Sequence, residues 1–195
     1  MVDAGSFQGE LLDELLKKLP GYKFKTTALD INEVALGNNQ AADQKIAADA
    51  ESMPFADKRI DVLIVRYMLQ WNDAEKQQRI LKEIARVIKE FALIEHAGAD
   101  TLDTDNWRAK VDDLFDGEEV PKMKRGEHFY SSKDEVEKWL QQSGITFERI
   151  KDRRIEDAAD NYIERFGLNV DEAEKARKIL ADKNYFLQTD WIIYP

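Results

Sequence analysis

The chain has 195 residues and a net charge of −10 at pH 7; 43% of its residues are hydrophobic and 35% are charged. This composition is typical of a folded globular protein, and the length allows one α/β core with a modest insertion but not two full-sized domains. The acidic charge argues against a nucleic-acid surface, because binding to phosphates depends on lysine and arginine. We therefore expect no nucleic-acid partner.

The sequence also bears on the cellular compartment. It contains no cysteine, which excludes disulfides and thiolate metal ligands and fits a reducing environment. It has neither an apolar run of about 18 residues, the length that spans a membrane, nor a basic and apolar leader of the secretory type. We expect a cytoplasmic protein without a membrane span.

Apolar runs typical of strands alternate with helix-period segments, which is the pattern of a parallel α/β sheet. In the first half, this pattern predicts strands over residues 2–4, 22–30, 44–49 and 60–65 and helices over 10–19, 32–42 and 72–90. The uninterrupted β-branched run at 60–65 is typical of a central strand that is covered on both faces. Asn32 is the expected cap of the second helix, and Asn72 or Asp73 that of the third.

The second half continues the alternation. The pattern predicts strands over 91–97, 145–155 and 185–195 and helices over 103–117, 131–144, 156–166 and 171–183. Ser131 or Ser132 is the expected cap of the helix over 131–144. Because the last strand follows strictly alternating units, we expect it to pair antiparallel with the strand at 145–155. The predicted fold class is α/β, with a doubly wound, mostly parallel sheet, an antiparallel C-terminal strand and a helical insertion before it.

Polar residues stand where four of the predicted strands end. They are the turn from Gly5 to Gly9, Asp30, Asp49 and the pair Arg66 and Tyr67. In an open parallel sheet, ligands bind at the carboxyl ends of the strands, beside the point where the strand order reverses. Glycines let the backbone approach a ligand at a helix N-terminus, and a carboxylate at the end of the second strand can accept both hydroxyls of a ribose. The arrangement favours an adenosine-containing ligand.

These segments resemble the class I, Rossmann-like S-adenosylmethionine-dependent methyltransferases, particularly the small-molecule group of the ubiquinone and menaquinone biosynthesis type. VDAGSFQGELL is similar to the family's glycine motif, ALDIN to its acidic segment, and AADAESMPF to the segment beside adenine. RIDVLIVRYMLQW followed by ILKEIARVIK resembles the central strand and the next helix, and is the most specific match. The resemblance covers residues 2–97 and continues to residue 195 in topology alone.

The resemblance implies that S-adenosylmethionine is the cofactor. The residues implied to bind it are Asp3, Gly5, Gly9, Asp30, Ile31, Asp49, Ala50 and Arg66. The two glycines would border the methionine moiety, on a loop that Asp3 steadies. Asp30 would bind the ribose diol, and Ile31 would pack on the adenine.

The remaining implied contacts lie around the adenine and the reacting methyl group. Asp49 would accept the adenine amino group, and Ala50 would offer its backbone N–H. Arg66 would lie beside the sulfonium and its methyl group, while Tyr67 and Trp71 would form the wall of the acceptor side.

Two histidines are candidates for acceptor chemistry. His96, at the end of the fifth strand, is the candidate general base because imidazole titrates near neutrality. His128 is a candidate residue of the acceptor site. The sequence contains neither a His-Glu-x-x-His motif nor clustered carboxylates, so we expect no metal. Because the protein is acidic, we expect a small acceptor that is uncharged or cationic.

Each of these assignments has a structural alternative. The glycines can be ordinary turn residues, and the aspartates at the strand ends can be helix or turn caps. The aromatic residues after the central strand can belong to the core. His96 can be a buried structural histidine, and His128 can lie on a surface loop.

Three features depart from the family pattern. Phe7 stands where the family has its middle glycine, and a side chain there would crowd the backbone's approach to the cofactor. We expect the chain to lack the helices that precede the glycine motif in the family and help to cover the acceptor pocket. RVIKEFALIEH has no Pro-Gly-Gly turn between the helix and the fifth strand, which leaves little chain for the connection.

We therefore expect an S-adenosylmethionine-dependent methyltransferase that acts on a small-molecule acceptor. It is predicted to form one domain over 1–195, with a cofactor-binding half at 1–97, an acceptor-side half at 98–195 and a helical insertion at about 155–183. The alternative is a methyltransferase-like protein that binds a ligand or partner without catalysis. A nicotinamide dehydrogenase is disfavoured because G-x-G-x-x-G is absent. A DNA-type amino methyltransferase is disfavoured because RYML stands where its motif would be.

Overall fold

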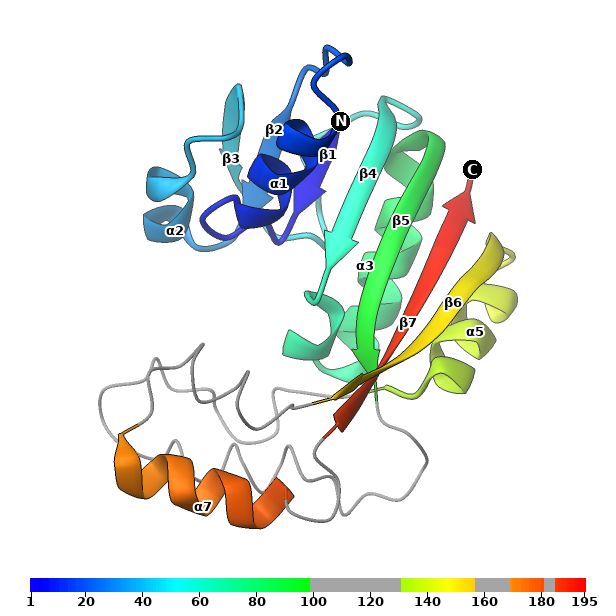
Figure 1. The fold of residues 1–195 in the computed structure, drawn as a ribbon. Coiled ribbons are helices and arrows are strands. Elements are labelled where there is room, and N and C mark those ends of the chain that lie inside the picture. The colour runs from blue at the N-terminus through cyan, green and yellow to red at the C-terminus, as the bar shows by residue number, and fades with distance from the viewer. Residues whose placement is uncertain (99–130, 157–168, 181–184) are drawn as a thin grey trace.

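The computed structural model describes residues 1–98, 131–156, 169–180 and 185–195. Within these ranges the strands form one seven-stranded sheet in the order β3-β2-β1-β4-β5-β7-β6 (Figure 1). The strands are β1 (Val2–Ala4), β2 (Thr27–Asp30), β3 (Gln44–Ala47), β4 (Ile60–Arg66), β5 (Ile88–Gly98), β6 (Thr146–Glu156) and β7 (Tyr185–Tyr194). The helices are α1 (Glu10–Lys18), α2 (Glu33–Asn38), α3 (Ala74–Val87), α5 (Lys133–Gln142) and α7 (Val170–Leu180), and η1 (Leu69–Trp71) is a 3-10 turn.

The strand order reverses beside β1. The chain proceeds outward from β1 through β2 to β3 and then returns to the other side of β1 with β4 and β5, all parallel. Ala4 at the end of β1 is paired with Leu29 on one side and Val65 on the other. The carboxyl ends of β1, β2 and β4 therefore lie together at the switch point. β7 runs antiparallel to both β5 and β6, as expected from its late position.

The main core lies between α3, α5 and one face of the sheet. Its fully buried members include Ile80 and Ile84 of α3, Leu140 of α5 and Trp191 of β7. In Figure 1, α3 lies behind β4 and β5, whereas α1 lies in front of β1 and β2. Leu12 of α1 is buried outside the main cluster. Helices thus cover both faces of the parallel part of the sheet, as the predicted doubly wound arrangement requires.

Most of the expected elements are confirmed, with small changes at their ends. Asn32 caps α2 by accepting the N–H of Ala35 at 3.0 Å, and Asp73 caps α3. Ser132 caps α5 in a capping box with Glu135. The strand expected over 22–30 is shorter, because β2 has partners only from Thr27 onward, where β1 and β3 lie alongside it.

The connection between α3 and β5 differs from the expected one. The helical periodicity predicts a helix over 72–90, but α3 ends at Val87, and Ile88 already pairs with Ile60 of β4. The carbonyls of Arg86 and Val87 accept the backbone N–H groups of Lys58 and Arg59, each at 2.9 Å. The segment before β4 therefore satisfies the end of the helix where a connecting turn would normally do so.

Some expected elements lie outside the described residues. These are the helix over 103–117, most of the helix over 156–166 and the end of the helix over 171–183, whose described part is α7. No helix in the described ranges is long and apolar enough to span a membrane.

The guanidinium of Arg86 should stabilise the direct connection from helix to strand. It donates hydrogen bonds to Asp57 at 2.6 Å, to Glu83 at 2.7 Å and to the carbonyl of Met53 at 3.3 Å. Arg86→Met should lower the free energy of unfolding by about 1–2 kcal/mol, because a partly exposed network of charged hydrogen bonds is lost. Urea unfolding measures this loss.

The matched control is Lys89→Met, two residues into β5. The side chain of Lys89 is exposed and bonds Asp61 at 3.2 Å, so its removal should lower the free energy of unfolding clearly less than Arg86→Met does. Equal losses for the two variants would contradict a special role for Arg86 at this connection.

Candidate functional site

The loop from Gly5 to Gly9 adopts a left-handed backbone at three positions. The φ angles are 75° at Gly5, 47° at Phe7 and 92° at Gly9. The N–H of Gly5 donates to the carbonyl of Leu29 at 2.8 Å, and that of Phe7 donates to Oδ2 of Asp30 at 2.8 Å. The loop is therefore fastened to the end of β2.

Both glycines are required by close approach as well as by φ. A Cβ at Gly5 would lie 2.7 Å from the side chain of Met68, and a Cβ at Gly9 would lie 2.5 Å from that of Asn39. Met68 follows β4, and Asn39 follows α2. The glycine loop thus packs against two segments that are distant in the sequence, which an ordinary turn glycine does not need.

Gly9→Ala tests this packing. We expect a loss of about 1–3 kcal/mol in the free energy of unfolding, because alanine must adopt a left-handed φ at this position and its Cβ clashes with Asn39. Gly37→Ala is the control, because a Cβ at this position in α2 has open space and an ordinary φ. It should be neutral or stabilising by up to about 1 kcal/mol. A similar loss in both variants, measured by urea unfolding, would contradict the interpretation.

Asp30 lies at the end of β2, facing the glycine loop. Its Oδ2 accepts the N–H of Phe7 and its Oδ1 accepts the N–H of Asn32 at 2.9 Å. Each oxygen keeps a lone pair for a further donor, so the carboxylate is oriented and can still bind a ligand. Ile31, the next residue, is largely exposed, which leaves its side chain accessible to a flat ligand.

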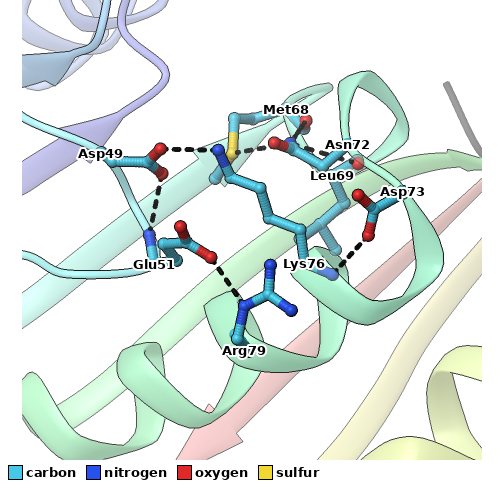
Figure 2. Close-up of polar contacts among 8 residues, drawn as sticks. All are labelled: Asp49, Glu51, Met68, Leu69, Asn72, Asp73, Lys76 and Arg79. Carbon is cyan, nitrogen blue, oxygen red and sulfur yellow. Dashed lines mark hydrogen bonds and ion pairs between the residues drawn. The ribbon is translucent and has the colours of Figure 1, made fainter. Parts of the chain in front are cut away.

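Asp49 follows β3 and is held by two donors, as Figure 2 shows. The N–H of Glu51 donates to Oδ1 at 3.1 Å, and Nζ of Lys76 donates to Oδ2 at 2.6 Å. Ala50 beside it is buried. No local pattern predicts a role for Lys76, which lies in the first turn of α3 and links that helix to the segment after β3.

The turn after β4 is held by a neighbouring side chain. Nδ2 of Asn72 donates to the carbonyl of Met68 at 3.0 Å and to that of Leu69 at 3.4 Å (Figure 2). This fixes η1, which ends with the half-buried Trp71. Met68 is thereby held against Gly5, and Trp71 lies within the same short turn.

Asp3 is a buried acid beside the loop. It lies in the middle of β1, and its Oδ2 has no hydrogen-bond partner within the described part of the chain. Burial raises the pKa of this carboxyl to about 7; Arg66 opposes the rise, whereas Asp30 and Glu10 add to it. Near neutral pH, the site therefore contains an acid that ionises at a cost, and a nearby cation would reduce that cost.

The pKa of Asp3 gives stability a specific pH dependence. Its carboxyl has a pKa of about 7 when folded, against the ordinary value of 3.8, so the unfolded chain loses this proton first and stability falls as pH rises between the two values. Asp3→Asn removes the penalty. It should raise the free energy of unfolding by about 2–4 kcal/mol near pH 8 and change it little near pH 4. Urea unfolding of both proteins across this range measures the difference, and a pH-independent one would refute the assignment.

A polar network spreads from Arg66 across three further strands. Its other members are Tyr67, Glu95, Arg153, Gln188 and Asp190. Arg66 pairs in register with Glu95, and Glu95 pairs with Asp190, so their side chains share one face of the sheet. The guanidinium of Arg66 lies 5.3 Å from the ring centroid of Tyr67, and the hydroxyl of Tyr67 bonds Oε1 of Gln188.

His96 faces the opposite side of the sheet from this network. Only 1% of its surface is exposed, and its Nε2 lies 2.9 Å from the carbonyl oxygen of Ser131 and 3.1 Å from the hydroxyl. The centroid of its ring lies 6.1 Å from the ring centroid of Trp191. These surroundings favour the structural alternative, and the general-base role of His96 stays a prediction. His128 lies outside the described residues.

The structure thus brings most of the predicted residues to the same edge of the sheet. Asp3, the glycine loop, Asp30 and Arg66 meet around the switch point. Asp49 lies at the end of the neighbouring β3. The described residues contain no group of three or more acidic, histidine or cysteine side chains that could hold a metal ion.

Part of the chain matches a known protein family. Residues 2–94 match the model of a family described as a methyltransferase domain. No curated protein sequence matches the chain.

Solved structures match nearly the whole chain. A putative methyltransferase from Bacillus halodurans C-125 has a TM-score of 0.70 at 16% identity, with 98% of this chain and 89% of that one covered. The YcgJ protein from Bacillus subtilis has a TM-score of 0.71 at 16% identity, with 98% and 88% covered. A geranyl diphosphate C-methyltransferase from Streptomyces coelicolor A3(2), in complex with Mg²⁺, geranyl diphosphate and S-adenosyl-L-homocysteine, has 0.64 at 10% identity, with 99% and 70% covered. The fold is the Rossmann-like fold found in methyltransferase structures.

Proposed function

We propose that the protein is an S-adenosylmethionine-dependent methyltransferase that acts on a small-molecule acceptor. The observation that carries the proposal is the contact between the glycine loop and Asp30, at the carboxyl ends of β1 and β2. It joins a backbone loop that can approach a ligand closely to a carboxylate that can accept a ribose diol, beside the switch point where such sheets bind ligands. The methyltransferase-domain match over residues 2–94 and the similarity to methyltransferase structures support it.

The residues fit this cofactor on several counts. Gly5 and Gly9 leave no room for a Cβ where the loop turns, and the buried Oδ2 of Asp3 and Oγ of Ser6 have no partners among the described residues. The loop would bind the methionine moiety, Asp30 the ribose, and Asp49 with Ala50 the adenine, against Ile31. The bound cofactor supplies an electrophilic methyl group on a cationic sulfonium, and Arg66 would lie beside it.

Phe7 does not prevent this arrangement. It adopts a left-handed backbone, which glycine adopts without strain, and 47% of its surface is exposed. Its N–H bonds Asp30, so the main chain keeps its course and the side chain points away from the packed interior. The ring would then flank the cofactor rather than fill its place. The cost is a strained non-glycine residue, of about 1–2 kcal/mol.

The acceptor would be bound on the other side of Arg66. Tyr67 and Trp71 would form its wall, and His128 is a further candidate. An uncharged or cationic small molecule suits the charge of −10. We place the protein nearest the ubiquinone and menaquinone type of methyltransferase, on the sequence motifs alone, and infer that nucleic acid is not its substrate.

Calorimetry with S-adenosylmethionine and S-adenosylhomocysteine tests the function. Both should bind the wild-type protein, and Asp30→Ala should weaken both by about 30-fold or more, because the ribose loses two hydrogen bonds to a charged group. Absence of binding at millimolar ligand would refute the proposal.

The matched control is Asp61→Ala. Asp61 is exposed near the start of β4, away from the carboxyl ends of the strands, and it pairs with Lys89. Its removal changes the net charge by the same amount and should leave both affinities unchanged. If the ligands bind but no acceptor among small phenols, alcohols and amines is methylated, the protein is instead the non-catalytic ligand-binding relative considered above.

A further inference from the structure

We propose that Glu95 is the group that takes the proton from the methyl acceptor. The assignment rests on the proposed methyltransferase function and goes beyond it, because it names the proton acceptor and the class of substrate. Hydroxyl compounds, thiols, amines and carbon nucleophiles all lose a proton on methylation, so Glu95 implies an acceptor that carries such a proton.

The position of Glu95 follows from strand register. Arg66, at the end of β4, is paired with Glu95 on β5, and the N–H of Tyr67 donates to the carbonyl of Glu95 at 2.9 Å. β4 is also paired with β1, whose end leads directly into the glycine loop. Glu95 is thus one strand away from the switch point, on the face that also holds Arg66.

The carboxylate of Glu95 has unused hydrogen-bonding capacity. Its oxygens lie 3.6 Å from Nε of Arg66 and 3.7 Å from Nη2 of Arg153, which is beyond hydrogen-bond distance. No side chain or backbone group of the described residues donates a hydrogen bond to it, although 23% of the side chain is exposed. A group so placed is close to two cations and can still accept a proton from a ligand.

Asp190, the second acid of the network, differs from Glu95 in its hydrogen bonds and in its exposure. Asp190 accepts Nη2 of Arg153 at 2.6 Å and Nε2 of Gln188 at 2.7 Å, and its side chain is only 12% exposed. Each of its oxygens thus already accepts a strong hydrogen bond and the side chain is less exposed than that of Glu95, so its role is to hold Arg153 and Gln188. Within the network, Glu95 is the carboxylate that is left to act on a ligand.

The surroundings also set the proton affinity of Glu95. Burial raises the pKa of its carboxyl, and Asp190 adds to the rise, while Arg66 and Arg153 oppose it. A carboxylate whose pKa is raised is a better proton acceptor than an exposed one.

The reaction balances with these groups alone. A lone pair of the acceptor forms the bond to the methyl carbon as the bond from that carbon to sulfur breaks, with its electron pair staying on sulfur. Glu95 takes the proton that the acceptor loses and releases it to water. Arg66 and Arg153 hold the carboxylate on this face of the sheet.

The first test needs no acceptor. S-adenosylmethionine carries a positive charge at sulfur that S-adenosylhomocysteine lacks, so an anion near the reacting centre favours the former. Glu95→Gln should weaken S-adenosylmethionine binding about fivefold more than S-adenosylhomocysteine binding, as expected for a partly screened charge nearby. Calorimetry with the full chain measures both affinities.

Glu90→Gln is the matched control, because Glu90 is on the same strand and 58% exposed, beside Lys89. It should leave the ratio of the two affinities unchanged. Equal effects of Glu95→Gln on both ligands would overturn the placement of Glu95. If neither ligand binds the wild type, the proposed function itself fails.

The second test measures methyl transfer from labelled S-adenosylmethionine to a panel of small phenols, alcohols and amines. Glu95→Gln should lower kcat about 100-fold or more while S-adenosylhomocysteine still binds, and Glu95→Asp should restore part of the rate. Glu90→Gln should behave as the wild type. A normal kcat in Glu95→Gln would overturn the proposal, whereas methylation of no panel member by the wild type would count against the proposed function on which it rests.

Discussion

The structure depends on the pairing of the three-residue strand β1 with a strand on each side. Val2, Asp3 and Ala4 are all paired in parallel with both β2 and β4. This double pairing fixes the switch point and brings the glycine loop, Asp30 and Arg66 to the same edge of the sheet. It also buries Asp3 in the middle of β1. The geometry that assembles the site therefore includes a carboxyl group that is costly to ionise.

The sequence predicted the strands and helices where local signals agree with the tertiary structure. Caps at Asn32, Asp73 and Ser132 and the uninterrupted run of β4 are of this kind. The start of β5 could not be predicted, because Ile84, Val87 and Ile88 continue a helical period and a buried strand is equally apolar. Tertiary hydrogen bonds from Lys58 and Arg59 end the helix there, and such partners are invisible to a local pattern.

The residues of the candidate site also fall into those that a local pattern predicts and those that it does not. Residues next to strand ends, such as Asp30 and Asp49, could be placed from the strand pattern alone. Lys76 and Arg153 could not, because each reaches its partner through packing or register between segments far apart in the chain. His96 and Glu95 show the limit most clearly: neighbours on a strand face opposite sides, and only the register with β4 and β7 says which side faces the site. The imidazole has the more suitable chemistry, and the carboxylate has the more suitable place.

Several acidic side chains of the protein lie close together at the candidate site. Asp3 and Glu95 each lie near other carboxylates, and Arg66 offsets part of the resulting repulsion at both. A cationic sulfonium would add a second positive charge among these carboxylates and so lower the cost of ionising Asp3. Part of the binding free energy would then come from relief of repulsion that is already present in the free protein. Loss of that charge when the methyl group leaves would restore the repulsion, so the same carboxylates that favour binding of the charged cofactor would also favour release of its neutral product.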